Sequence, residues 1–188
     1  MKKVLFLLLV TIAGRQLMAQ TWSGDKAHSH FTFTVVHLGI NDIDGAFTDF
    51  DTEIKATKPD FSDATVHFVA RTASVNTNSS MRDEHIKSPD FFDVVKFPEI
   101  TFQSTFIKKI ANNKYQLKGN LTLLGKTKPV ICELTYRGTV KNPQSNQDVA
   151  GLSITGSLKR SDFAFGGNFP APLLSNEVTF KASGEFKK

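Results

Sequence analysis

The chain has too little cysteine and too little net charge for several common classes of protein. Cys132 is the only cysteine among 188 residues, so an intramolecular disulfide is excluded. The formal net charge is +5, but Lys2, Lys3 and Arg15 lie in a leader-like segment. The remaining chain has 20 basic and 18 acidic residues. A near-neutral domain without a stripe of Lys and Arg has little electrostatic reason to bind nucleic acid.

Sequence motifs of the common hydrolases, zinc enzymes and nucleotide-binding proteins are also missing. The sequence has no Gly-x-Ser-x-Gly elbow, no His-Glu-x-x-His and no phosphate-cradling glycine loop. Ser29 lies between His28 and His30, but neighbours in a strand point to opposite faces. The two histidines, with His37 nearby, can chelate a metal, yet no Cys or carboxylate accompanies them at the usual ligand spacing. We therefore expect no enzyme activity, no metal and no cofactor.

Residues 1–19 have the features of a cleaved signal peptide. A basic start, Met1-Lys2-Lys3, precedes an apolar run from Val4 to Ala13, and Ala19 offers a small residue for cleavage. The run is about half the roughly 20 residues that a membrane-spanning helix needs. We expect residues 20–188 to form one periplasmic or secreted domain without stable membrane insertion.

Apolar residues recur at every second position in eight segments of the mature chain, which predicts half-buried strands. Turns rich in Asn, Gly, Pro and Asp separate the segments, and short links favour antiparallel neighbours. Eight such strands predict an all-β up-and-down barrel or a sandwich, and closure would remove exposed sheet edges. The alternating residues are Phe31, Phe33 and Val35; Phe50, Thr52 and Ile54; Val66, Phe68 and Ala70; Ile100, Phe102 and Phe106; Tyr115, Leu117, Leu121 and Leu123; Val130, Cys132, Leu134 and Tyr136; Leu152, Ile154 and Leu158; and Val178, Phe180, Ala182 and Phe186.

A short helical insertion is predicted around residues 79–96, between two of these strands. Asn78 or Ser79 can cap a helix through His85, and Ser88-Pro89-Asp90 has the features of a second helix start. The segment that follows is too apolar for an exposed loop, so we expect it to pack over an open end of the barrel. Its apolar residues are Phe91, Phe92, Val94, Val95 and Phe97.

Several short motifs, individually weak, occur in a specific order and spacing. They are Trp22, Asp25 and His28-Ser29-His30-Phe31-Thr32-Phe33; His37-Leu38-Gly39 and Gly45-Ala46-Phe47; Ser74-Val75-Asn76-Thr77, Arg82-Asp83-Glu84-His85 and Lys87-Ser88-Pro89-Asp90-Phe91-Phe92-Asp93; Pro98-Glu99-Ile100-Thr101-Phe102; and residues 119–130 and Arg160-Ser161-Asp162-Phe163. Together they resemble the YceI-like family of exported lipid-binding proteins, over essentially the whole mature chain. The resemblance implies a single antiparallel eight-stranded, lipocalin-like barrel that holds a polyisoprenoid or similar long-chain lipid in an elongated cavity. Ala164 departs from the family pattern, which commonly has Gly there, and a positive φ would strain an alanine.

Aromatic residues supply the candidates for the lining of such a cavity. The mature chain has 16 phenylalanines, whose stiff rings can line a slot for an unsaturated chain at little entropic cost. Burial gains about 0.8 kcal/mol per CH₂, so a ten-carbon tail offers roughly 8 kcal/mol before ordering costs. The same rings can instead fill an ordinary solid core. The lining candidates are Phe33, Phe50, Phe68, Phe91, Phe92, Phe102, Leu121 and Tyr136.

Basic residues of the insertion are candidates for contact with a lipid head group. Arg82, His85 and Lys87 can bind a phosphate through charge-assisted hydrogen bonds, whereas the competing interpretation is that Arg82 and Asp83 only fix the loop. For Arg160 and Asp162 we favour a structural pair at a strand end.

These features favour an exported carrier of an isoprenoid-type lipid. The alternative is a lipid-modifying hydrolase or isomerase that uses the His-rich amino-terminal strand. A homodimer is compatible with the resemblance, since related proteins pair.

Overall fold

The computed structural model describes residues 18–188, which form ten strands. The eight predicted segments are among them, and the sequence pattern did not predict the strands Asn41–Phe47 and Val75–Asn76. The predicted signal peptide lies, except for its last two residues, outside this described part. The strands are β1 (Gln20–His37), β2 (Asn41–Phe47), β3 (Phe50–Ala56), β4 (Thr65–Arg71), β5 (Val75–Asn76), β6 (Glu99–Ala111), β7 (Lys114–Leu123), β8 (Lys126–Lys141), β9 (Asp148–Lys159) and β10 (Leu174–Lys187). Three short helical segments accompany them: η1 (Thr72–Ser74), α1 (Ser80–Lys87) and η2 (Arg160–Phe163).

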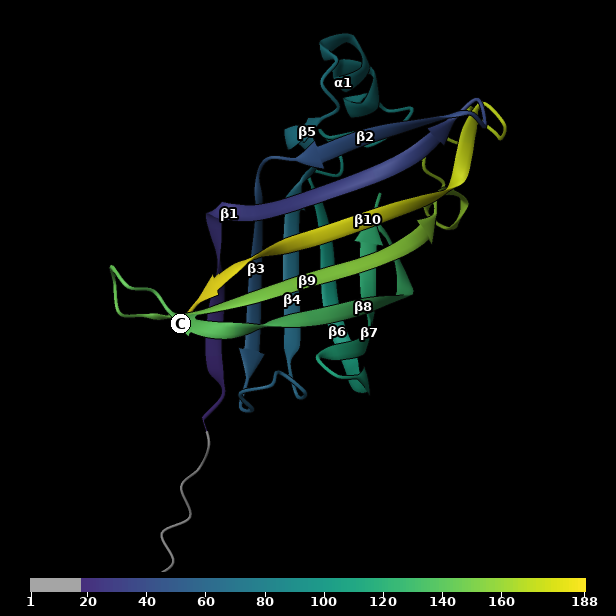
Figure 1. The fold of residues 1–188 in the computed structure, drawn as a ribbon. Helices are drawn as coiled ribbons and strands as arrows, with labels where there is room; N and C mark the ends of the chain where they lie inside the picture. The colour runs from purple at the N-terminus through teal and green to yellow at the C-terminus, as the bar shows by residue number, and fades with distance from the viewer. Residues whose placement is uncertain (1–17) are drawn as a thin grey trace, which may run out of the picture.

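Eight of the strands close into an antiparallel barrel, as the sequence predicts. They follow the order β1-β3-β4-β6-β7-β8-β9-β10, and β10 pairs back with β1. Strand β1 makes this closure possible because it is 18 residues long. Its start pairs with β3 and its end pairs with β2, while β10 runs along its other edge. In Figure 1, β1, β10, β9 and β8 cross in front of β3, β4, β6 and β7.

One end of the barrel is filled with tightly packed side chains. Tyr115, Leu117 and Leu134 are fully buried, and Trp22 packs against Phe61 with ring centroids 5.3 Å apart. The Tyr115 hydroxyl is also satisfied, because it donates to the Asp60 carbonyl oxygen at 2.6 Å. This end therefore has the dense apolar packing of an ordinary protein core.

A β-bulge changes the predicted facing of one residue in β6. The sequence pattern predicts Phe106 on the same inward face as Phe102, but Phe106 is 47% exposed. The pairing of β6 with β7 shifts register between Ser104 and Phe106, and Ile107 then takes the position opposite the buried Leu117. An extra residue in one strand moves the following side chains to the other face, which explains the error.

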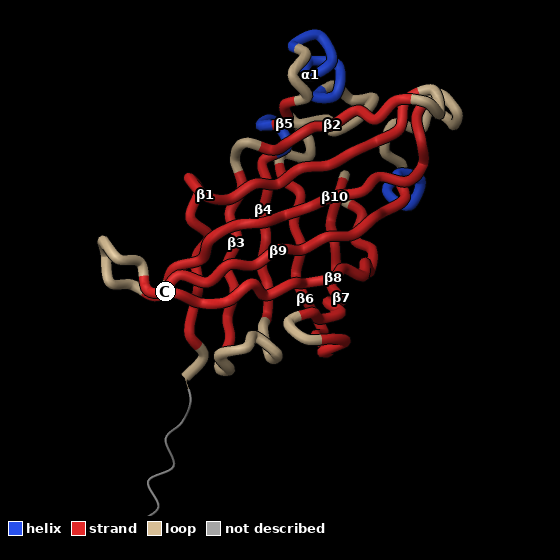
Figure 2. The backbone as a smooth tube through the Cα atoms, in the orientation of Figure 1, coloured by secondary structure: helices blue, strands red, loops and turns tan. Residues whose placement is uncertain are grey.

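The insertion after β5 lies over the opposite end of the barrel (Figures 1 and 2). Helix α1 begins after Ser79, as predicted, but residues 89–96 form turns rather than a second helix. Phe91 and Phe92 are buried, whereas Val95, predicted to pack beside them, is 93% exposed. No helix within residues 18–188 is both long and apolar enough to cross a membrane.

Arg160 organises the loop between η2 and β10. Its buried guanidinium donates to five backbone carbonyl oxygens, those of Phe165, Gly166, Phe169, Leu174 and Ser175, at 2.8–3.2 Å. The structural role favoured from the sequence is therefore supported, but the partner predicted for Arg160, Asp162, was wrong. Asp162 is exposed, while the guanidinium lies inside the loop. Arg160 fixes the path of residues 165–175 without using their side chains.

Ala164 has the positive φ that would strain an alanine. Ala164 ends η2 in the left-handed conformation, with φ 56° and ψ 29°. Gly166, two residues later, has a φ of 61°. An alanine with this φ costs roughly 1–2 kcal/mol relative to its preferred conformations. The Arg160 hydrogen bonds stabilise the loop against this cost.

Replacing Arg160 should destabilise the fold well beyond the loss of a surface charge. Arg160→Met leaves five carbonyl oxygens without their donor, and we expect the free energy of unfolding to fall by about 3 kcal/mol or more. Denaturant titration followed by circular dichroism measures this change. Lys159→Met, at the neighbouring exposed position, is the control and should change stability little; equal effects of the two variants would contradict the role assigned to Arg160.

Candidate ligand-binding cavity

The barrel is hollow at the end covered by the insertion. The cavity has a volume of about 430 Å³, within the roughly 300–1,000 Å³ typical of small-molecule sites. All eight barrel strands contribute to its walls, and the insertion and the loop before β10 cover one end. Twelve phenylalanines line it: Phe31, Phe33, Phe47, Phe50, Phe68, Phe91, Phe92, Phe102, Phe165, Phe169, Phe180 and Phe186.

Glycines on neighbouring strands help to explain why these rings leave a void. Phe180 pairs with Gly156, and a Cβ atom built on that glycine would lie 2.7 Å from the Phe180 Cζ atom. Phe33 lies in the same way against Gly45. Each ring thus occupies the space where its neighbour lacks a side chain. The rings lie along the barrel wall instead of projecting to the centre.

Seven of the eight predicted lining residues face the cavity; Tyr136 does not. Strand β8 contributes Val130 and Cys132 to the cavity wall, and Tyr136 lies farther along it, at the filled end. Its ring packs on Phe61 at 5.0 Å, and its hydroxyl lies 2.8 Å from the Thr139 hydroxyl. Tyr136 is therefore a core residue. Contact of the other seven with a ligand stays a prediction.

Two loop phenylalanines that sequence reasoning missed complete the cover of the cavity. Phe91 of the insertion stacks on Phe169 with centroids 4.8 Å apart, and Phe92 meets Phe165 at 4.6 Å. Phe165 and Phe169 lie in the loop held by Arg160, where no strand periodicity marks a residue as buried. The insertion, which the sequence predicted to pack over an open end of the barrel, therefore covers the cavity together with the loop held by Arg160. These two segments form a two-part lid.

The three head-group candidates differ in their position. Arg82 and His85 line the cavity, whereas Lys87 does not. The Nζ atom of Lys87 instead forms an ion pair with the Oε1 atom of Glu84 at 3.2 Å. Arg82 donates through Nε and Nη2 to the hydroxyl and carbonyl oxygens of Thr77, at 2.7 Å each. Its Nη1 has no hydrogen-bond partner among residues 18–188. Arg82 thus fixes the loop and leaves one donor group for another partner.

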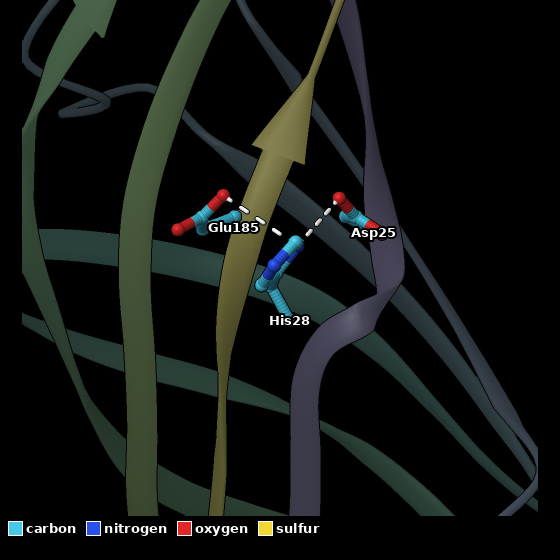
Figure 3. Close-up of side chains that lie close together, drawn as sticks. All are labelled: Asp25, His28 and Glu185. Carbon is cyan, nitrogen blue, oxygen red and sulfur yellow. Dashed lines mark hydrogen bonds and ion pairs between the residues drawn. The ribbon is translucent and has the colours of Figure 1, made fainter. Parts of the chain in front are cut away.

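Of the three amino-terminal histidines, only His37 lines this cavity, whereas His28 and His30 do not. His28 is not among the lining residues and is instead exposed on the outside of the barrel, near Asp25 and Glu185 (Figure 3). One potential ligand atom from each of the three lies within 4.8 Å of the others. Lys187, however, already forms an ion pair with Asp25 at 2.5 Å. The group is best described as an ion-pair network that joins β1 to β10.

Electrostatics within this network favours charged forms. The Lys187 ammonium, with help from His28 and the Ala27 amide, holds the pKa of Asp25 well below its usual range. In turn, the hydrogen bond to Asp25 and its negative charge raise the pKa of His28.

The Cys132 thiol in the cavity wall is held in its neutral form, since burial raises its pKa to about 11. A thiol with this pKa is protonated at neutral pH and is a poor nucleophile.

Sequence comparison agrees with this architecture. Residues 22–186 match the family model of the YceI-like domain. The chain belongs to the YceI-like family. Among relatives, a UPF0312 protein of Pseudomonas syringae pv. tomato is 37% identical over 175 residues, which cover 90% of each chain. A UPF0312 protein of Staphylococcus aureus strain N315 is 34% identical and covers 86% of this chain and 94% of its own.

Two solved structures share this fold. The Campylobacter jejuni YCEI protein has a TM-score of 0.75 at 30% identity, covering 81% of this chain and 88% of its own. A polyisoprenoid binding domain from Saccharophagus degradans, implicated in plant cell wall breakdown, has a TM-score of 0.65 at 11% identity. The match covers 90% of this chain and 98% of that domain's chain. At that identity the likeness shows the shared fold alone.

The His28 network should stabilise the YceI-like barrel in a pH-dependent way. The pKa of His28 is higher in the folded state than in the unfolded state. Protonated His28 therefore stabilises the fold fully at pH values below its unfolded-state pKa, and this stabilisation is lost as the pH rises through its folded-state pKa. The melting temperature of the wild type should therefore exceed that of His28→Gln by more at about pH 5.5 than at about pH 9. In an Asp25→Asn background, His28→Gln should lose most of this pH dependence; an unchanged dependence would refute the pairing.

Proposed function

We propose that this protein is an exported carrier that holds a long-chain isoprenoid-type lipid in the barrel cavity. The observation that carries the proposal is the cavity itself, a void of about 430 Å³ walled almost entirely by aromatic and aliphatic side chains. A linear unsaturated chain is the ligand class that fits stiff, flat walls with few polar groups. The polyisoprenoid binding domain of Saccharophagus degradans, which shares the fold, supports the same class of ligand.

Binding without catalysis is the activity that the site supports. The cavity presents few titratable side chains, among them His37, Arg82, His85 and Arg160, and all donors of Arg160 are already occupied by carbonyl oxygens. A lipid hydrolase needs a nucleophile or activated water beside a base. Of the histidines of the amino-terminal strand, on which the enzymatic alternative depends, His28 lies on the outer surface and only His37 lines the cavity. The carrier function therefore accounts for more of the structure.

Export is part of the proposal because of the amino-terminal segment. The basic start, the short apolar run and Ala19 are typical of a cleaved signal peptide. The periplasm or the extracellular space would then be the compartment in which the carrier meets its lipid.

Arg82 is the residue that we assign to the lipid head group. It lines the cavity and has one nitrogen, Nη1, that no protein group occupies within the described chain. His85 lies beside it in the lid, with its ring edge-on to Phe91 at 5.1 Å. A phosphate at the cavity mouth would accept a charge-assisted hydrogen bond from the guanidinium. Lys87 is left out of the site.

Lipid content tests the carrier function directly. Protein purified without detergent should release a stoichiometric long-chain lipid into organic solvent, identified by mass spectrometry. Ala182 faces the cavity, so Ala182→Phe should place a ring where the lipid lies and reduce loading at least about tenfold, the loss expected from displacing a few buried CH₂ groups. Its melting temperature should stay close to that of the wild type, because the new ring enters a void.

Thr179→Phe, at an exposed position on the same strand, is the matched control and should load lipid normally. A solid core would give the opposite result for Ala182→Phe, since overpacking costs about 1–3 kcal/mol. Strong destabilisation of that variant, with no lipid in the wild type, would reject the carrier function.

The head-group assignment has its own test. Arg82→Gln should weaken binding of a polyprenyl phosphate by about tenfold, the value of one charge-assisted hydrogen bond, and leave binding of the matching polyprenol unchanged. Fluorescence competition measures both affinities. Lys87→Gln is the control, because Lys87 lies outside the cavity. Equal losses for phosphate and alcohol would show that Arg82 acts only by fixing the loop.

A further inference from the structure

Exposed aliphatic side chains gather at one corner of the barrel. The turn between β1 and β2 presents Leu38 and Ile40, which are 51% and 85% exposed. The Leu38 amide donates to the carbonyl oxygen of Leu173, which is 40% exposed, so the two segments lie side by side. Figure 1 shows the β1–β2 turn beside the yellow segment that precedes β10. We call Leu38, Ile40 and Leu173 the apolar tip.

The apolar tip is continuous with the mouth of the cavity. His37 and Leu174 pair across β1 and β10, and both line the cavity. Leu173 also lines it, while Leu38 and Ile40, next to it, face outward. An apolar path therefore runs from the cavity wall to the surface of the molecule at this corner.

Charged side chains are missing from both segments that build this corner. Residues 35–41 and 163–176 contain no Asp, Glu, Lys or Arg, although 22% of the chain is charged. Exposed apolar residues are usually scattered singly among polar ones. A surface that is apolar and uncharged fits the interior of a lipid layer, and it offers nothing for electrostatic attraction to a charged partner.

Leu38 also occupies an unfavourable backbone conformation. It has a φ of 54°, followed by Gly39 with a φ of 72°. Turns with positive φ at both central residues favour Asn-Gly or Asp-Gly, because a bulky residue with positive φ is strained. Burial of the Leu38 side chain does not offset this strain, because Leu38 is half exposed. A leucine here makes the turn less stable and its surface more apolar.

From these observations we infer that the apolar tip inserts into a lipid bilayer, so that the ligand passes between membrane and cavity at this corner. The inference rests on the proposed carrier function for its ligand, but the docking step is separate. Insertion of aliphatic side chains alone predicts binding that does not need anionic lipid and is not weakened by salt. A protein that receives the lipid is the competing occupant, and the experiment separates the two.

A double variant tests the tip without disturbing the fold. Leu38→Asn with Ile40→Thr removes both aliphatic side chains, and Asn suits the positive φ of the turn. Neither residue lines the cavity, so the affinity of the cavity for a polyprenol should be unchanged. Val140→Thr is the control, since Val140 is 68% exposed on β8, outside the tip segments and the cavity lining.

Two measurements with phosphatidylcholine vesicles are sufficient. Flotation of the lipid-free protein with vesicles reports docking, and transfer of a fluorescent polyprenol from protein to vesicles reports delivery. We expect the double variant to lose about tenfold or more in both, because it withdraws two aliphatic side chains from the bilayer, and the control to match the wild type. High salt and added phosphatidylglycerol should change neither quantity for the wild type.

Other outcomes overturn the inference. Wild-type flotation by the double variant, or docking that appears only with phosphatidylglycerol and vanishes in salt, would show that the tip does not insert. Transfer that requires an added protein and not the tip would favour the competing occupant. If the protein carries no lipid at all, flotation still decides the docking step, and only the carrier function fails.

Discussion

Closure of the sheet between β1 and β10 is the constraint on which the rest of this structure depends. The two ends of the chain supply these strands, and their pairing extends along nearly the whole of β10. Backbone hydrogen bonds then leave no long free edge on the barrel. Because the wall is held by the backbone, its inner side chains are free to leave a void. The outer network of Asp25, His28 and Lys187 crosses the same seam and reinforces it.

The two halves of the barrel interior show how one strand pattern gives two outcomes. Tyr115, Leu117 and Leu134 are fully buried at the filled end, whereas inward-facing residues such as Phe33, Phe180 and Ala182 at the end below the insertion keep accessible surface. Pairing of Phe180 with Gly156 is one source of this difference. A pattern of alternating apolar residues specifies the face of a strand and not the density of packing behind it.

The same limit explains what could be predicted from the sequence. Alternation over eight segments predicted an antiparallel barrel or a sandwich, and the order and spacing of the motifs from Trp22 to Phe163 identified the family and with it the barrel. The facing of Phe106 was wrong because a bulge adds a residue that no alternation reveals. Phe165 and Phe169 were missed because they belong to a loop, where burial depends on distant partners such as Phe91 and Phe92. Tyr136 shares the inward pattern of its neighbours but lies beyond the reach of the cavity.

The buried guanidinium of Arg160 has a consequence for how the sequence of this barrel can vary. Its five hydrogen bonds end on backbone carbonyl oxygens, which every amino acid has. These five bonds hold the path of the loop over the cavity whichever side chains the loop carries, except at Gly166, where a Cβ atom would lie 2.8 Å from Phe91 and 2.9 Å from Arg160. Substitutions in the loop can change the shape and polarity of the lid while the lid keeps its place. Because Arg160 holds the loop through its backbone, side chains that would contact a ligand can change without loss of the bonds that stabilise the barrel.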